Sequence, residues 1–279
     1  MIERKTGKFK STDNLQLFYR WAKPENPQGT VVVVHGVCEH CDRYQWLEES
    51  FLEKQISFYS YDQRGHGRSE GNGTEIKGFS DYVNDLEQFF TEIVNPENQG
   101  PVILMGHSMG SLIAILYALK DPPGLKGLVL AAPPFDPVIP LIKIRFFFGK
   151  FICKFFPNLT VHNGIKSHQI SSDLNVVDDY DSDPMVSHKV TLVWGVELIK
   201  TIEKLKLKSG NIRLPFLILH GTADTIARID GASKFLEGVA SPDKSLKAFP
   251  GLRHELHNER ESDRQKVLFY LTEWILKHF

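Results

Sequence analysis

Residues 101–119 read PVILMGHSMGSLIAILYAL, and their pattern is the strongest indication of the fold of this chain. A short apolar run at 101–105 leads into Gly-His-Ser-Met-Gly at 106–110, and an apolar segment at 111–119 follows that is long enough for a helix. A short apolar run that ends in glycine is typical of a strand buried on both faces of a parallel sheet. A G-x-S-x-G sequence between such a strand and a helix predicts a sharp turn that exposes the hydroxyl of Ser108 above the sheet.

The same strand pattern recurs on both sides of this stretch. Apolar runs rich in β-branched and aromatic residues occupy 30–35, 56–61, 125–130 and 214–219. Between the runs lie helical patterns, and from 79 to 93 the apolar residues recur at helical spacing. This alternation predicts an α/β fold with a mostly parallel, doubly wound sheet. Residues 15–22 alternate loosely in polarity, so we expect an antiparallel edge strand there.

The alternation of strands and helices is interrupted once. After Ala131 come two prolines and a long segment without a clear buried strand, in which 138–156 and 188–206 have helical patterns. The strand pattern resumes near Leu214. The sequence therefore predicts a core in two parts, 1–136 and 211–279, with an inserted and mostly helical subdomain at 137–210.

Composition narrows the class of protein. The 279 residues include 33 Lys plus Arg and 34 Asp plus Glu, for a formal net charge of -1, which gives no global affinity for nucleic acid. The three cysteines are Cys38, Cys41 and Cys153, and the charged N-terminus lacks the apolar core of a signal peptide. We therefore expect a cytoplasmic chain with reduced thiols. No apolar run reaches the roughly 20 residues of a membrane-spanning helix.

A serine hydroxyl becomes a good nucleophile only when a base accepts its proton, and a carboxylate must orient that base. On strand–turn–helix folds of this kind the chain order is serine, acid, histidine. Asp224 lies just past the C-terminal end of the predicted strand at 214–219, and His254 follows a later strand pattern. His257 is a rival base and Asp230 a weaker rival acid, because Asp230 lies further from the strand end. Spacing alone leaves both histidines open.

Attack on an ester carbonyl creates an oxyanion that backbone N–H groups must stabilise. One donor is expected directly after the nucleophile, at Met109, and the other in the loop after the first buried strand. That loop reads HGVCEH at 35–40, so the N–H of Val37 is the second candidate.

Several motifs resemble metal or cofactor sites but are incomplete. Cys38-Glu39-His40-Cys41 lacks a second pair of zinc ligands, and HELH at 254–257 is one residue shorter than the zinc motif H-E-x-x-H. The loop at 62–69 lacks the lysine and spacing of a phosphate-binding loop, so we interpret it as a structural turn. We expect no metal and no cofactor.

The chain resembles the monoglyceride lipases and related lysophospholipases of the α/β-hydrolase superfamily. The pieces that carry the resemblance span nearly the whole chain and read HGVCEHCDRY (35–44), DQRGHGRS (62–69), GHSMG (106–110), DSDPM (181–185), HGTAD (220–224) and RHELHNE (253–259). The resemblance implies an α/β-hydrolase fold whose helical cap covers an apolar acyl tunnel. It selects His254 as the base and implies that Glu39, Arg43 and His257 bind a glycerol head group. This chain has Cys38 where the family loop commonly has glycine.

Together these features predict a serine hydrolase that cleaves monoacylglycerols to fatty acid and glycerol through an acyl-enzyme intermediate. Other activities on the same fold are alternatives: lysophospholipase, general carboxylesterase, thioesterase, acyltransferase or peptidase. A binding protein without catalysis is a further alternative, because fold alone does not determine function.

The segment VIPLIKIRFFFGKFICKFF, 138–156, contains no acidic residue. On a helical wheel its apolar residues gather on one face, and the opposite face carries Lys143, Lys150 and Lys154 beside Phe146 and Phe147. A basic amphipathic helix with aromatic residues suits an anionic lipid surface, so we expect peripheral membrane contact here. Alternatively, the helix only covers the acyl tunnel and its lysines face water.

Overall fold

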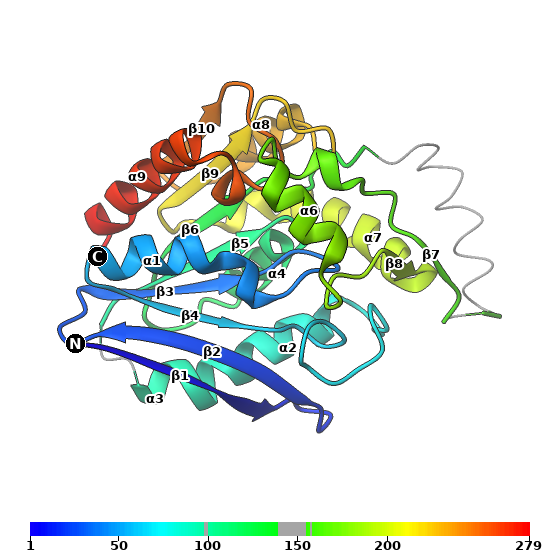
Figure 1. Cartoon of the computed structure of the whole chain (residues 1–279), viewed down its shortest axis with the longest axis horizontal. Coiled ribbons are helices and arrows are strands. Elements are labelled where there is room, and N and C mark those ends of the chain that lie inside the picture. Colours follow the sequence, from blue (N-terminus) through cyan, green and yellow to red (C-terminus); the bar gives the residue numbers. More distant parts are fainter. Residues whose placement is uncertain (98–99, 139–154, 157) are drawn as a thin grey trace.

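The computed structural model describes residues 1–97, 100–138, 155–156 and 158–279. Their centre is an eight-stranded sheet in the order β1-β2-β4-β3-β5-β6-β9-β10 (Figure 1). From β4 to β10 neighbouring strands run parallel, whereas β2 pairs antiparallel with β1 and with β4. The predicted α/β class is thereby confirmed. The strands are β1 (Ile2–Lys10), β2 (Gln16–Pro24), β3 (Gly29–Val34), β4 (Ile56–Tyr61), β5 (Val102–His107), β6 (Leu125–Ala131), β9 (Phe216–Gly221) and β10 (Lys244–Phe249).

The predicted edge strand at 15–22 corresponds to β2, but β2 is not at the edge. The unpredicted strand β1 pairs with it along its whole length and forms the outer edge of the sheet. Its sequence carries no burial pattern because only Phe9 is buried. Its charged side chains point to solvent, and charges on an edge strand discourage pairing with another sheet.

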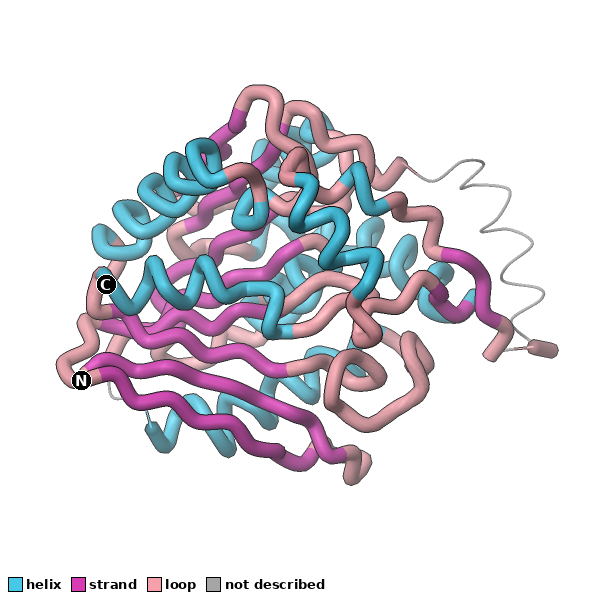
Figure 2. Tube along the Cα trace, viewed as in Figure 1, coloured by secondary structure: helices cyan, strands magenta, loops and turns pink. Residues whose placement is uncertain are grey.

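Successive residues of the central strands point into two separate hydrophobic cores. Val31 and Val33 pack with α1 (Gln45–Glu53) and α9 (Glu261–Lys277) on one face, and Val32 and Val34 pack on the other. The second face is covered by α2 (Phe79–Phe89), α4 (Met109–Ala118), α7 (Leu192–Lys208) and α8 (Ile229–Gly238), as the two layers of helices in Figure 2 show. Burial on both faces explains why these strands have continuous apolar runs.

Between β6 and β9 the described chain forms smaller elements that do not join the eight-stranded sheet. A two-stranded antiparallel pair, β7 (Thr160–His162) with β8 (Lys189–Thr191), accompanies α6 (Leu174–Ser182). The predicted helix at 188–206 corresponds to β8 followed by α7. Most of the predicted helix at 138–156, with its lysines and Cys153, lies outside the described residues. Single turns and short helices complete the chain: η1 (Cys41–Tyr44), η2 (Phe90–Val94), α3 (Asn95–Glu97), η3 (Ser167–Gln169), η4 (Ser209–Asn211) and η5 (Leu256–Asn258).

The carboxyl ends of the parallel strands lie along one edge of the sheet, where catalytic groups gather in open α/β folds. Beyond these ends come the loop after β3, Ser108 after β5, Asp224 after β9 and His254 after β10. Among the described residues, no helix combines the length and the apolar character needed to cross a bilayer.

Candidate active site

Ser108 joins β5 to α4 in a backbone conformation that few residues other than glycine adopt, with φ 49° and ψ -120°. Such conformations cost on the order of 1–3 kcal/mol and concentrate at functional sites. The Ser108 N–H donates to the carbonyl of Ala131 at 2.9 Å, which ties the turn to β6. A Cβ at Gly106 or Gly110 would collide with the carbonyl oxygen of Gly110 or Val34, respectively. The close approach of α4 to β5 and β3 therefore requires both glycines.

Asp224 and His254, which are far apart in the sequence, meet beside this turn. The Nδ1–H of His254 donates to Oδ2 of Asp224 at 2.7 Å, and Oδ1 of Asp224 accepts the N–H groups of Ile226 (2.8 Å) and Ala227 (3.0 Å). Burial alone would lower the pKa of His254, but the charge and hydrogen bond of Asp224 outweigh it and raise that pKa. With Nδ1 engaged, Nε2 of His254 is the nitrogen available as a base.

The rival residues lack this arrangement. His257 is buried between rings: it stacks on Tyr44 at a centroid distance of 4.6 Å and contacts His107 edge-on at 5.2 Å. Neither of its ring nitrogens hydrogen-bonds to a described residue, and burial lowers its pKa to about 4. Asp230 lies exposed on α8. The geometry therefore favours Asp224 and His254 over both rivals.

The loop of residues 36–40, which follows β3, faces Ser108 across the site. Val37, Ser108 and Met109 line one cavity, as expected if the N–H groups of Val37 and Met109 serve one oxyanion. Cys38 has φ 64°, in the left-handed region where glycine is favoured. The cysteine therefore adopts a backbone conformation that is more favourable for glycine, the residue that the family loop commonly has at this position.

Two cavities meet at Ser108. The larger, of about 120 Å³, is mainly apolar, and its lining includes Pro134, Ile165, Trp194 and Leu198. The smaller, of about 20 Å³, lies on the side of His254 and is lined in part by Glu39, Tyr180 and Glu255. A cavity of this size holds about one water molecule. A glycerol group would enter it only if neighbouring side chains moved.

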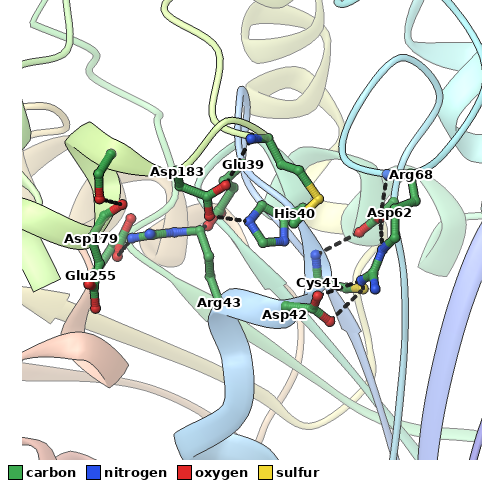
Figure 3. Close-up of polar contacts among 12 residues, drawn as sticks. Glu39, His40, Cys41, Asp42, Arg43, Asp62, Arg68, Asp179, Asp183 and Glu255 are labelled. Atoms are coloured by element: carbon green, nitrogen blue, oxygen red, sulfur yellow. Dashed lines mark hydrogen bonds and ion pairs between the residues drawn. The ribbon is translucent and has the colours of Figure 1, made fainter.

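Of the three residues predicted to bind a head group, one lines the small cavity and two do not. Glu39 lines the small cavity, whereas Arg43 and His257 lie behind its wall. The Arg43 guanidinium donates to Glu255 at 2.6 Å and lies 3.4 Å from the Glu39 carboxylate (Figure 3). It also packs on the ring of Tyr180. Burial and the nearby Glu255 raise the pKa of Glu39 to about 7. Direct contact of Arg43 or His257 with a head group stays a prediction.

Glu255 and Tyr180 are site residues that the sequence did not predict. Both line the small cavity, and Glu255 is buried beside Arg43. The signal was available for Glu255, since it directly follows His254 in a motif that the chain shares with the resembled family. Tyr180 gave no such signal, because it lies just outside the DSDPM piece at 181–185 and reaches the site only through the packing of α6.

The loop at 62–69 has a structural role, as interpreted from the sequence. Asp62 accepts the N–H groups of Cys41 (2.8 Å) and Arg68 (2.9 Å), and Arg64 forms paired hydrogen bonds to Asp85. Cys38 and Cys41 are free and buried. Within the described ranges, no group of three or more His, Cys, Asp or Glu side chains is arranged to hold a metal ion.

The chain is similar to known proteins over almost its full length. The family model described as "Serine aminopeptidase, S33" matches residues 25–261. The monoglyceride lipase of Rattus norvegicus is 32% identical over 269 residues, which are 95% of this chain and 88% of that protein. The monoacylglycerol lipase of Mycolicibacterium smegmatis is 32% identical over 92% of this chain and 91% of that protein.

A solved structure has the same fold. It is a soluble variant of the monoglyceride lipase of Saccharomyces cerevisiae in complex with a substrate analogue. It superimposes with a TM-score of 0.87 at 25% sequence identity, over 100% of this chain and 95% of that one.

Proposed function

This chain belongs to the monoglyceride lipase family of α/β-hydrolases, and on that premise we propose that it hydrolyses monoacylglycerols to a fatty acid and glycerol. The observation that carries the proposal is the pairing of His254 with Asp224 at 2.7 Å beside the strained turn of Ser108. A nucleophile, a base and an orienting carboxylate are the parts that acyl transfer to serine requires.

In the proposed reaction, Oγ of Ser108 attacks the ester carbonyl and Nε2 of His254 accepts the hydroxyl proton. The N–H groups of Val37 and Met109 stabilise the oxyanion. His254 then protonates the departing glycerol oxygen, which leaves an acyl-enzyme on Ser108. A water molecule attacks this ester with His254 again as base, and the fatty acid is released.

The two cavities suit the acyl chain of the substrate and the attacking water molecule. An acyl chain gains free energy when apolar surface leaves water, and the larger cavity supplies an apolar wall next to Ser108. The small cavity beside His254 suits the attacking water, because it has room for about one water molecule. Glu39 and Glu255 there offer acceptors to glycerol hydroxyls once the wall has moved.

The decisive experiment compares wild type with Ser108→Ala on a panel of monoacylglycerols, lysophospholipids and p-nitrophenyl esters. We expect monoacylglycerol to be the best substrate and kcat to fall by on the order of 10⁶ in the variant. A fluorophosphonate should label wild type and not Ser108→Ala. Turnover by a folded Ser108→Ala protein would refute the serine mechanism, and a preference for lysophospholipids would refute the substrate assignment.

We further infer that 137–210 is a cap over the acyl site and that it contacts lipid peripherally in a cytoplasmic protein. Phe155 and Phe156 are 61% and 64% exposed, and Leu159 and Val161 are exposed nearby in the sequence. The free cysteines suit a reducing compartment. The basic and aromatic residues of the same segment, Lys143, Phe146, Phe147, Lys150 and Lys154, lie outside the described residues.

The membrane proposal is tested by co-sedimentation with anionic vesicles at low and high salt. Each surface lysine contributes about 1 kcal/mol to such binding. Wild-type binding should fall as salt rises, and changing Lys143, Lys150 and Lys154 together to Glu should weaken binding while hydrolysis of a short, water-soluble ester survives. Equal binding by the triple variant would leave the segment only its role as a cap.

A further inference from the structure

The loop that carries the Val37 N–H is held from outside by the segment between α6 and α7. The Nε2–H of His40 donates to Oδ2 of Asp183 at 2.8 Å, and these two side chains face each other in Figure 3. The N–H of Ser187 donates to the Cys38 carbonyl at 3.0 Å, and the Cys38 thiol lies 3.5 Å from the carbonyl of Lys189. Three contacts therefore join the 36–40 loop to residues 183–189.

The 36–40 loop needs such support because its backbone is strained. A left-handed conformation costs a residue other than glycine roughly 1–2 kcal/mol, and Cys38 has φ 64°. Strained backbone persists where the surroundings over-determine it. From inside the loop, Glu39 accepts the Gly36 N–H at 2.5 Å and the Tyr44 hydroxyl at 2.7 Å. The contact of His40 with Asp183 fixes the other end.

Asp183 is itself held in place. Its N–H donates to the carbonyl of Asp179 at the end of α6, and its Oδ1 accepts the N–H of Met185 at 2.8 Å. This leaves Oδ2 directed at His40. Burial would raise the pKa of Asp183, but the hydrogen bonds from His40 and Met185 outweigh burial and lower it. An ionised carboxylate is the stronger acceptor for this bond.

We propose that His40 and Asp183 are positioning residues, whose hydrogen bond holds the Val37 N–H in the orientation that stabilises the oxyanion. This inference rests on the proposed function, since it assigns a role in the same reaction. It makes residues 183–189 part of the catalytic support and not merely part of a cover. Loss of an oxyanion donor costs about 10²–10³ in kcat, and loss of its support costs a part of that factor.

The chain offers a matched control for the proposed pair. Asp179 lies on the same stretch of chain and lines the same surface cavity as His40 and Asp183. Its side chain is exposed, and no hydrogen bond or ion pair joins its carboxylate to the described residues. Replacing Asp179 removes the same charge from the same surface without touching the 36–40 loop.

The experiment is a double-mutant cycle of His40→Leu and Asp183→Ala, with His40→Gln and Asp179→Ala alongside. Activity is measured on a monoacylglycerol and on the methyl ester of the same acid. Each single variant should lower kcat roughly tenfold to a hundredfold on both esters, with KM within about twofold. The double variant should be no worse than the worse single variant, because both changes remove one bond. His40→Gln should recover most of kcat through its amide N–H, and Asp179→Ala should leave kcat unchanged.

Other outcomes overturn the proposal. These are kcat within about twofold of wild type in both single variants, independent losses that multiply in the double variant, or a loss confined to the monoacylglycerol. The last result would mean a head-group contact. If circular dichroism shows that His40→Leu is unfolded, the proposal is tested by Asp183→Ala against Asp179→Ala. A similar kcat in these two variants would then overturn it.

Failure of the proposed function can be distinguished from failure of the role proposed for His40 and Asp183. If wild type cleaves only the methyl ester, the substrate assignment is wrong and the cycle is read on that ester. If it cleaves neither ester, the rate of fluorophosphonate labelling of Ser108 replaces kcat, and equal rates in wild type and Asp183→Ala refute the pair.

Discussion

Replacing Asp224 with asparagine should almost abolish turnover without disturbing the fold, because the local hydrogen bonds dictate how the new amide sits. The N–H groups of Ile226 and Ala227 donate to Oδ1, so the amide oxygen of the introduced side chain takes that place. Its NH₂ group then replaces Oδ2, 2.7 Å from Nδ1 of His254. Two donors cannot face each other, so Nδ1 loses its proton and Nε2 carries it toward Ser108. In that tautomer His254 cannot accept the serine proton.

The expected decrease in kcat is about 10⁴-fold, as in serine proteases in which the same substitution leaves the histidine in the wrong tautomer. This decrease corresponds to an increase of about 5.4 kcal/mol in the activation free energy, at 1.36 kcal/mol per tenfold change. The assay is p-nitrophenyl ester hydrolysis, with circular dichroism and thermal unfolding to show that the variant is folded. Asp230→Asn, on the exposed face of α8, is the matched control and should be fully active. If the folded Asp224→Asn variant kept a tenth of wild-type kcat, Asp224 would not be the orienting acid.

Four further predictions concern the same site. His254→Ala should lose kcat about as severely as Ser108→Ala, whereas His257→Ala should keep most of it, and the reverse order in ester assays would exchange their roles. The kcat/KM profile should rise with pH through a midpoint above 6.5, because Asp224 raises the pKa of His254 and only the neutral imidazole accepts a proton. Because the pKa of His254 is higher in the folded protein, its ion pair with Asp224 should also stabilise the fold. Thermal unfolding should show this contribution in full below the unfolded-state pKa of histidine, and should show it lost as pH rises through the folded-state pKa. Replacing Glu39, Arg43 and His257 together with alanine should narrow the kcat/KM ratio between a monoacylglycerol and the methyl ester of the same acid, and an unchanged ratio would argue against a head-group site.

The sequence alone determined the features that depend on local pattern. Burial on both faces produces the continuous apolar runs of β3, β4, β5, β6 and β9, and these runs predict the strands from the sequence alone. Gly106 and Gly110 could be recognised in the sequence as part of the turn, because the turn leaves no room for a Cβ at either position. The chain order of serine, acid and histidine was expected from the fold class that the strand–turn–helix pattern indicates. These features depend only on residues that are close in the sequence, so periodicity and residue type are enough to predict them.

Tertiary structure decided the features that depend on which distant residues meet. Strand β1 is stabilised by backbone pairing with β2 and by few buried side chains, so its charged sequence could not reveal it. Spacing left His254 and His257 open as bases; the fold turns one ring toward Asp224 and stacks the other on Tyr44. The contact of His40 with Asp183 joins positions 143 residues apart. Such contacts arise from the packing of whole elements, so the periodicity of a single segment cannot predict them.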